Sequence, residues 1–180
     1  YNPPAGIPEL REIIAQDVND RLGRAVNVDQ VVISPGAKPH LFFPTLALVE
    51  PGDEVLYPDP GFPSYAALRG VAGGVPVPVP LVEGANFSVE LDSFDTLISS
   101  RTRLIILNSP GNPTGGVMPH SDLEHIADRA MKHDCWVISD EIYSRIHYLD
   151  DEVPSIVSLP GLDDRSILVD GFSKTYAMTG

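Results

Sequence analysis

The sequence predicts an α/β fold with three layers (α/β/α), in which helices cover both faces of a mostly parallel sheet. Two observations carry this prediction. Short runs rich in Val and Ile alternate along the chain with segments of helical periodicity. These runs are almost continuously apolar, as expected of parallel strands that are buried on both faces. A chain of 180 residues is also long enough to form one domain with a sizeable core.

Each predicted strand is a short apolar run bounded by polar or turn residues. These strands are 31–34, 54–57, 103–108, 135–139 and 166–170. The run VPVPVP at 75–80 is also extended, but its prolines cannot donate ladder hydrogen bonds. We therefore expect it to be an edge strand or the exit of a strand.

Helices are predicted over 121–133 and over about 7–22. The first has a single apolar stripe, formed by Leu123, Ile126, Ala127, Ala130 and Met131. Ser121 and Glu124 form a capping-box pattern at its start. No fixed-period repeat or flexible linker interrupts this alternation of strands and helices.

Composition excludes several classes of function. Asp and Glu outnumber Lys and Arg by 25 to 12, which argues against nucleic acid as a partner. The apolar runs are too short to cross a membrane, and residues 1–10 lack the pattern of a signal peptide. The single cysteine, Cys135, fits a reducing cytoplasm, and the five histidines lack metal-ligand spacing. We expect a cytoplasmic protein without a bound metal.

Chemically useful residues follow each predicted strand. Parallel sheets bind ligands outside the carboxyl ends of their strands. Taken singly, each residue has an ordinary structural explanation, such as a turn, a helix cap or a solvated lysine. Together at one sheet edge they predict a binding site. In strand order they are Gly36, Phe62, Asn108 with Asn112, Asp140 with Tyr143, and Lys174.

Three motifs in this order resemble a known family. They are NSPGNPTG at 108–115, SDEIY at 139–143 and GFSKTYAMTG at 171–180. They resemble the fold-type I aminotransferases that use pyridoxal 5′-phosphate, in the class I/II group similar to aspartate aminotransferase. The segments YNPPAGIPELREIIA and PGDEVLYPDPGFPSY match the same group, so the resemblance covers essentially the whole chain.

The resemblance implies roles for five residues around the cofactor ring. Lys174 matches the lysine that forms a Schiff base with the cofactor and then moves the substrate Cα proton. Asp140 matches the acid that pairs with the pyridinium nitrogen. Tyr143 and Asn112 match the groups that hydrogen-bond the ring 3-oxygen, and Phe62 matches the aromatic residue stacked on the ring.

The resemblance also implies a phosphate site. Gly36, Ala37 and Lys38 match the turn whose backbone N–H groups hold the cofactor phosphate at a helix N-terminus. Ser173 is a candidate hydroxyl donor, although the family often has a serine at the position of Gly171. Tyr1 matches a tyrosine that reaches the phosphate of a neighbouring subunit, which implies a homodimer with shared active sites.

Residues 1–180 are interpreted as a partial large cofactor-binding domain, without the N-terminal arm and the C-terminal small domain of the family. The full-length protein is expected to transfer amino groups between an α-amino acid and a 2-oxo acid, in biosynthetic metabolism. The fragment itself is expected to be inactive, because it lacks the arginines that the family uses for the cofactor phosphate and the substrate carboxylate.

Three alternatives remain open on the sequence. The same motifs occur in C–S lyases and ring-forming synthases that use the same cofactor. Aminotransferase-like domains also serve as sensors in transcriptional regulators, with a DNA-binding domain ahead of them. A non-catalytic homologue is the third alternative, and the intact set Lys174, Asp140, Tyr143 and Asn112 argues against it. The identity of the amino donor is not predicted.

Overall fold

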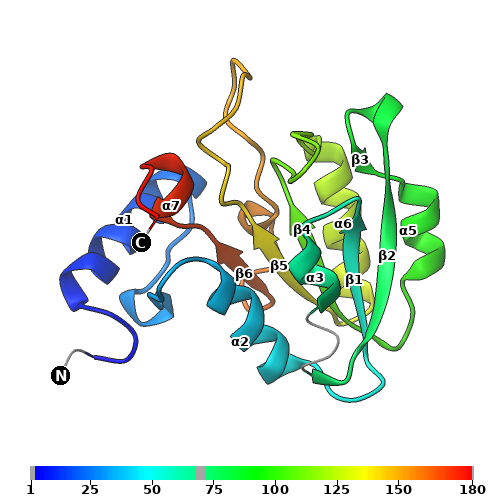
Figure 1. The fold of residues 1–180 in the computed structure, drawn as a ribbon, viewed down its shortest axis with the longest axis horizontal. Coiled ribbons are helices and arrows are strands. Elements are labelled where there is room, and N and C mark those ends of the chain that lie inside the picture. Colours follow the sequence, from blue (N-terminus) through cyan, green and yellow to red (C-terminus); the bar gives the residue numbers. More distant parts are fainter. Residues whose placement is uncertain (1–2, 68–71, 180) are drawn as a thin grey trace.

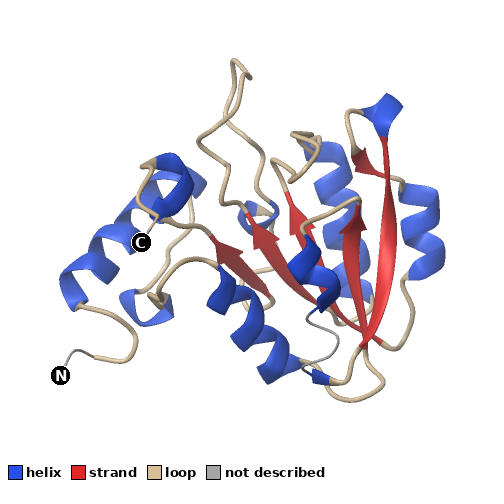
Figure 2. Ribbon diagram, viewed as in Figure 1, coloured by secondary structure: helices blue, strands red, loops and turns tan. Residues whose placement is uncertain are grey.

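A six-stranded sheet forms the middle layer of the computed structural model, which describes residues 3–67 and 72–179 (Figures 1 and 2). Its strands are β1 (Glu54–Asp59), β2 (Val75–Val82), β3 (Ser88–Val89), β4 (Thr102–Asn108), β5 (Trp136–Asp140) and β6 (Ser166–Val169). Their spatial order is β3-β2-β1-β4-β5-β6. All neighbouring pairs are parallel except β2 with β3. The mostly parallel sheet is as predicted.

Helices cover both faces of this sheet, as the predicted α/β/α class requires (Figure 1). One face packs against α5 (Leu91–Leu97) and α6 (His120–Lys132), and the other against α2 (Lys38–Leu48) and α3 (Pro63–Ala67). Strand β4 supplies both cores in alternation. Its Ile105 joins the α5 and α6 side, whereas Leu104 and Ile106 join the α2 and α3 side.

Two further helices, α1 (Pro8–Leu22) and α7 (Phe172–Thr175), lie near the β6 end of the sheet (Figure 1). Three short 3-10 helices, η1 (Val28–Gln30), η2 (Glu83–Ala85) and η3 (Ile156–Ser158), complete the described elements. Within the described ranges, no helix combines the length and apolar character that crossing a bilayer requires.

Four of the five predicted strands are confirmed as β1, β4, β5 and β6, and both predicted helices as α6 and α1. The capping box at the start of α6 is wrong. The helix begins one residue earlier, with Pro119 at its N-cap, and no side chain caps it. The Ser121 hydroxyl instead lies 3.3 Å from a carboxylate oxygen of Asp122.

The predicted strand at 31–34 is wrong. This segment is extended, but it lies outside the sheet, where its backbone bonds other parts of the chain. The Ile33 N–H donates to the Ala5 carbonyl at 2.9 Å, and the Arg11 guanidinium donates to the Val31 carbonyl at 2.8 Å. Val32 is 55% exposed, so this apolar run is not covered on both faces.

The Val-Pro run is confirmed as an edge strand along its proline stretch. Successive residues of a parallel strand turn their backbone polar groups to opposite sides. The Val75 N–H donates towards β1, to the Asp53 carbonyl at 2.7 Å, whereas the Pro80 carbonyl accepts from Glu90 on the other side. Strand β3 pairs only with Leu81 and Val82, beyond the last proline. The prolines therefore lie where ladder donors are not needed.

Candidate active site

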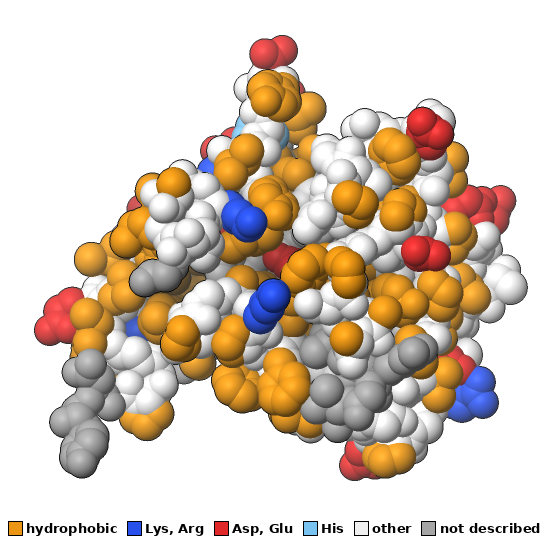
Figure 3. All heavy atoms as spheres, in the orientation of Figure 1, with side chains coloured by type: hydrophobic (Ala, Val, Ile, Leu, Met, Phe, Trp, Pro, Cys, Tyr) orange, Lys and Arg blue, Asp and Glu red, His pale blue; other side chains and the backbone are white. Residues whose placement is uncertain are grey.

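The strand order reverses between β1 and β4. The chain runs from β1 outwards to β2 and β3, and then crosses to β4 on the other side of β1. Open α/β sheets bind ligands at such a switch point, outside the carboxyl ends of the strands. Figure 3 shows a hollow near the end of β5, with basic side chains at its border and acidic atoms inside. The predicted ring-binding residues follow strands at this edge, whereas Gly36, Ala37 and Lys38 follow the extended segment 31–34, which lies outside the sheet.

Asp140 is the last residue of β5 and is only 5% exposed. Its Oδ2 accepts a hydrogen bond from the Tyr65 hydroxyl at 2.7 Å, and its Oδ1 accepts a weaker one from the Ile142 N–H at 3.4 Å. Burial raises the pKa of Asp140, the hydrogen bond from Tyr65 counteracts this, and the nearby Asp170 charge raises the pKa further. Both hydrogen-bond partners found among the described residues are neutral. This carboxylate is therefore suited to a cationic ligand atom.

Tyr65 is a site residue that sequence reasoning missed. It lies in α3, is 2% exposed, and packs edge-on against Phe62 with ring centroids 5.7 Å apart. Burial and the charge of Asp140 raise its pKa, so the hydroxyl remains a hydrogen-bond donor. The available signal was its position three residues after Phe62, but its partner Asp140 is 75 residues away in the chain.

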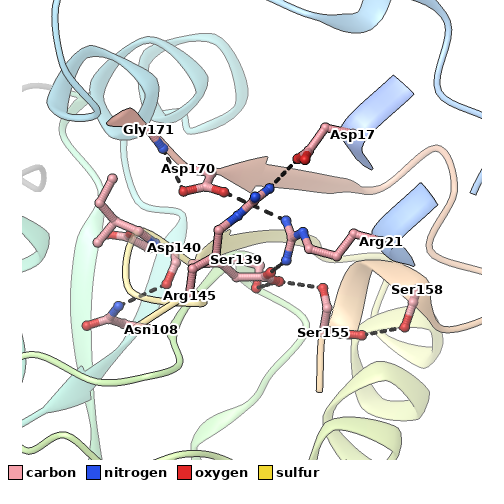
Figure 4. Close-up of polar contacts among 12 residues, drawn as sticks. Asp17, Arg21, Asn108, Ser139, Asp140, Arg145, Ser155, Ser158, Asp170 and Gly171 are labelled. Carbon is pink, nitrogen blue, oxygen red and sulfur yellow. Dashed lines mark hydrogen bonds and ion pairs between the residues drawn. The ribbon is translucent and has the colours of Figure 1, made fainter. Parts of the chain in front are cut away.

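Asn108 connects the turns after β4 and β5. Its side-chain amide donates to the Asp140 carbonyl at 2.9 Å (Figure 4). Its Oδ1 accepts from the Asn112 N–H at 2.8 Å. Sequence analysis identified Asn108 as a polar strand end but assigned it no role. Because Asn108 bonds both Asp140 and Asn112, the half-buried Asn112 is linked to the turn after β5.

Lys174 and Tyr143 approach each other from neighbouring strand ends. Lys174 lies in α7, after β6, and Tyr143 lies in the turn after β5. The Lys174 Nζ is 5.6 Å from the centroid of the Tyr143 ring, within the range of a cation–π contact. Two residues predicted to act on one cofactor are therefore neighbours.

The predicted phosphate turn lies at the N-terminus of α2. Gly36 has φ +81°, a left-handed conformation that favours glycine, and the Ser34 hydroxyl donates to its carbonyl at 2.7 Å. Ala37 is the N-cap, and Lys38 is the first helical residue. Backbone N–H groups at such a position have no partner within the helix and favour an anion.

The Lys38 side chain has a contact that sequence analysis did not predict. Its Nζ lies 5.6 Å from the centroid of the Phe62 ring. The phosphate turn and the predicted stacking residue are therefore adjacent in space. Two further residues were predicted to contact the phosphate. Ser173 is half-buried in α7, and Tyr1 lies outside the described residues.

A separate groove of about 440 Å³ opens at the opposite, amino-terminal edge of the sheet. Arg101, Arg103 and His133 are among the residues that line it. None of the predicted site residues takes part in it. We therefore base the candidate site on converging side chains at the carboxyl edge rather than on this groove.

Comparisons with known proteins agree on one family. Residues 1–180 match the model for "Aminotransferase class I and II". The chain is 43% identical to the aspartate aminotransferase of Pyrococcus abyssi and 41% identical to an arginine–pyruvate transaminase of Pseudomonas aeruginosa. Each alignment covers all of this chain and 46% of the relative, so the chain spans about half the length of these relatives.

Solved structures give the same result. The aromatic aminotransferase of Pyrococcus horikoshii superposes with a TM-score of 0.96 at 42% identity, covering 100% of this chain and 48% of that one. A Thermus thermophilus aspartate aminotransferase superposes with a TM-score of 0.94 at 37% identity, covering 100% and 46%. The fold of the entire chain, including the carboxyl edge of the sheet, is thus shared with these enzymes.

Proposed function

Because the chain belongs to the class I and II aminotransferase family, which depends on pyridoxal phosphate, we propose that the full-length protein is a transaminase. It transfers an amino group from an α-amino acid to a 2-oxo acid. The observation that carries the proposal is Asp140, a buried carboxylate with neutral described partners, at the same sheet edge as Lys174. Relatives are named for aspartate, aromatic amino acids and arginine, so the proposal does not extend to one donor.

The residues at the carboxyl edge fit the cofactor ring. Asp140 supplies the negative charge that holds a protonated pyridine nitrogen, and the ring nitrogen supplies the cation that Asp140 lacks. Phe62 offers a flat apolar face beside it. Tyr143 and Asn112 would hydrogen-bond the ring 3-oxygen from the turns after β5 and β4.

The start of α2 fits the cofactor phosphate. The N–H groups of Gly36, Ala37 and Lys38 face an anion with the favourable end of the helix dipole. Ser173 adds a hydroxyl from α7. Tyr1 of a second copy reaches the same phosphate in the homodimer that we propose, and exposed apolar side chains on α1 and α7, including Ile13 and Phe172, support such a contact.

Lys174 would hold the cofactor covalently through Nζ. When bound, the cofactor would supply an electron sink for the bonds of the substrate Cα. The Lys174 amine would take the proton from the substrate Cα. Asp140 would keep the ring nitrogen protonated, and Tyr65 and Asn108 hold Asp140 in position.

We also propose that residues 1–180 are the cofactor-binding part of a longer protein, supported by the 46% coverage of its relatives. Alone, this part is expected to be inactive, because substrate orientation supplies a large share of the rate enhancement. A cytoplasmic location is proposed from the single, buried Cys135.

The test uses the full-length protein and substitutes the lysine. With a panel of amino donors and 2-oxoglutarate, wild type should form a new amino acid, and borohydride should fix the cofactor onto the Lys174 peptide in mass spectrometry. Lys174→Ala should lower turnover by at least ~10³-fold, because it removes the nucleophile and the proton carrier together. Lys132→Ala, at the exposed end of α6, is the matched control and should retain activity. Full turnover in Lys174→Ala would refute the proposed mechanism.

A further inference from the structure

Helix α1 presents two charged residues, Asp17 and Arg21, to the segments that follow β5 and β6 (Figure 4). They are four residues apart and therefore lie on one face of the helix. Neither residue has a part in the proposed chemistry. Both nevertheless contact chain segments that carry the predicted cofactor residues.

Arg21 reaches both strand ends. Its Nη1 donates to Glu141 Oε2 at 3.3 Å, and its Nη2 lies 3.8 Å from Asp170 Oδ2. Glu141 follows Asp140 directly in the chain, and Asp170 begins the turn that leads to Lys174. One guanidinium therefore pairs with the segment that holds Asp140 and with the segment that holds Lys174.

Of the two partners of Arg21, Glu141 is buried and Asp170 is half-buried, and both accept further hydrogen bonds. Glu141 is 1% exposed, and its Oε1 accepts hydrogen bonds from the hydroxyls of Ser139, at 2.9 Å, and Ser155. The Asp170 Oδ1 accepts from the Gly171 N–H at 2.7 Å. Burial raises the pKa of both carboxyls, and the Arg21 charge counteracts the effect in each.

A second, more exposed pair lies beside the first. The Arg145 Nη2 donates to the Asp17 carboxylate, and its Nη1 donates to the Tyr176 hydroxyl at 3.3 Å. Arg145 follows Tyr143 by two residues, and Tyr176 follows Lys174 by two. The contacts of Arg21 and Arg145 together therefore join α1, the turn after β5 and the segment after β6.

We infer that Asp17, Arg21, Glu141, Arg145 and Asp170 form a clamp through which α1 positions Lys174 relative to Asp140 and Tyr143. This α1 clamp rests on the proposed function, because it assigns a purpose to the spacing of those cofactor residues. Helix α7 has only four residues and is too short to be stable by itself. The position of Lys174 therefore depends on what holds the segment around it. Arg21 is the central positioning residue, since it pairs with both turns.

The experiment measures cofactor affinity in the full-length protein. The cofactor-free enzyme is titrated with pyridoxal phosphate, followed by absorbance, and thermal unfolding is recorded without the cofactor. Arg21→Gln is compared with Arg24→Gln. Arg24 is a matched control, because its side chain is 18% exposed against 17% for Arg21. Its partners are Val157, Asp163 and Ser166, and none of them is a predicted site residue.

We expect Arg21→Gln to weaken cofactor affinity about tenfold and to change the pH dependence of the visible absorption of the bound cofactor. Arg24→Gln should lower the unfolding temperature yet leave affinity and absorption unchanged. Arg21→Lys, which can reach one carboxylate at a time, should restore part of the affinity. The clamp is overturned if Arg21→Gln lowers the unfolding temperature as Arg24→Gln does, but leaves both the cofactor affinity and the pH dependence of its absorption at their wild-type values.

If Arg21→Gln does not fold, Asp170→Asn decides the question. That variant keeps the Arg21–Glu141 pair and removes the attraction to the β6 turn, together with the Asp170 charge that raises the pKa of Asp140. We expect a threefold loss of affinity, and an unchanged affinity would overturn the clamp. Failure of the proposed function is distinguishable, because then wild type itself would not bind pyridoxal phosphate through Lys174.

Discussion

Two carboxylates at opposite edges of the same sheet differ in how their charge is satisfied. Glu54 begins β1 at the amino edge and Asp140 ends β5 at the carboxyl edge, and each is 5% exposed. Glu54 accepts hydrogen bonds from the Ser99 hydroxyl at 2.5 Å and from the Arg101 Nε at 2.9 Å. Asp140 accepts hydrogen bonds from the Tyr65 hydroxyl and, more weakly, from the Ile142 N–H.

The pKa values shift in opposite directions as a result. The hydrogen bond from Ser99, together with the Arg101 charge, lowers the pKa of Glu54 despite its burial. Burial dominates at Asp140 and raises its pKa. A buried acid that is paired with a cation of the protein stabilises the fold, whereas a buried acid without such a cation can bind a cationic ligand. Burial and residue type alone do not separate the two, but the charge of their partners does.

The largest effect is expected when each of the two acids, Asp140 and Glu54, is neutralised in turn. Asp140→Asn should reduce turnover about 100-fold, because losing an opposite charge shifts the protonation of the ring nitrogen by about two pKa units. Glu54→Gln should leave turnover unchanged and lower the free energy of unfolding by about 1–3 kcal/mol, through the lost charged hydrogen bonds. Steady-state kinetics and denaturant unfolding measure the two. Equal effects of both variants on turnover would contradict the distinction.

The same pair predicts opposite pH dependence of stability in the cofactor-free protein. The raised pKa of Asp140 means that the folded state binds its proton more tightly than the unfolded state. Its contribution to stability is therefore lost as the pH rises through the folded pKa. The lowered pKa of Glu54 means that its contribution is lost as the pH falls through the folded pKa. At pH 7, cofactor-free Asp140→Asn should unfold at a higher temperature than wild type, and Glu54→Gln at a lower one.

A smaller effect comes from Tyr65→Phe, which removes the hydroxyl but keeps the packed ring. Its hydrogen bond counteracts the raised pKa of Asp140, so its loss raises that pKa further. We expect cofactor affinity to fall roughly fivefold, equivalent to about 1 kcal/mol for one hydrogen bond, and its pH profile to shift to higher pH. Tyr57→Phe, on β1 among the α2-side core residues, is the control. A pH profile that remains at its wild-type position would show that Tyr65 does not act through Asp140.

The smallest expected effect is that of Gly36→Ala. An added Cβ meets nothing within 4 Å, so the cost comes from the left-handed backbone at φ +81°. That strain amounts to about 1 kcal/mol and is relieved by moving the phosphate turn. Cofactor affinity should fall a few-fold, whereas Gly23→Ala, also left-handed with open space around it at the end of α1, should alter stability alone. Titration of both variants compares them, and equal cofactor affinities would remove Gly36 from the site.

Much of the fold follows from local sequence patterns. The continuous apolar runs of β1, β4, β5 and β6 mark buried parallel strands, and the Val-Pro alternation marks the edge strand. The same rule failed at 31–34, because that run bonds the N-terminal segment instead of a strand. The two-residue strand β3 has no periodicity to detect. Strand ends then indicated which polar residues could meet.

The supporting residues could not be predicted, because their partners are distant in the chain. Tyr65 and Asp140 are 75 positions apart, and Arg21 and Glu141 are 120 positions apart. No periodicity within one segment encodes such pairs. The residue types that carry the chemistry were recognisable, whereas the residues that hold them in position became visible only in three dimensions.

The central claim is that Asp140, which has no cationic partner among the described residues, receives one in the cofactor ring nitrogen. The most direct test is ¹⁵N NMR of the full-length protein loaded with pyridoxal phosphate labelled at the ring nitrogen. The nitrogen should remain protonated at neutral pH in wild type and Glu54→Gln, and lose its proton in Asp140→Asn. An unprotonated nitrogen in wild type, or a protonated one in Asp140→Asn, would contradict the account.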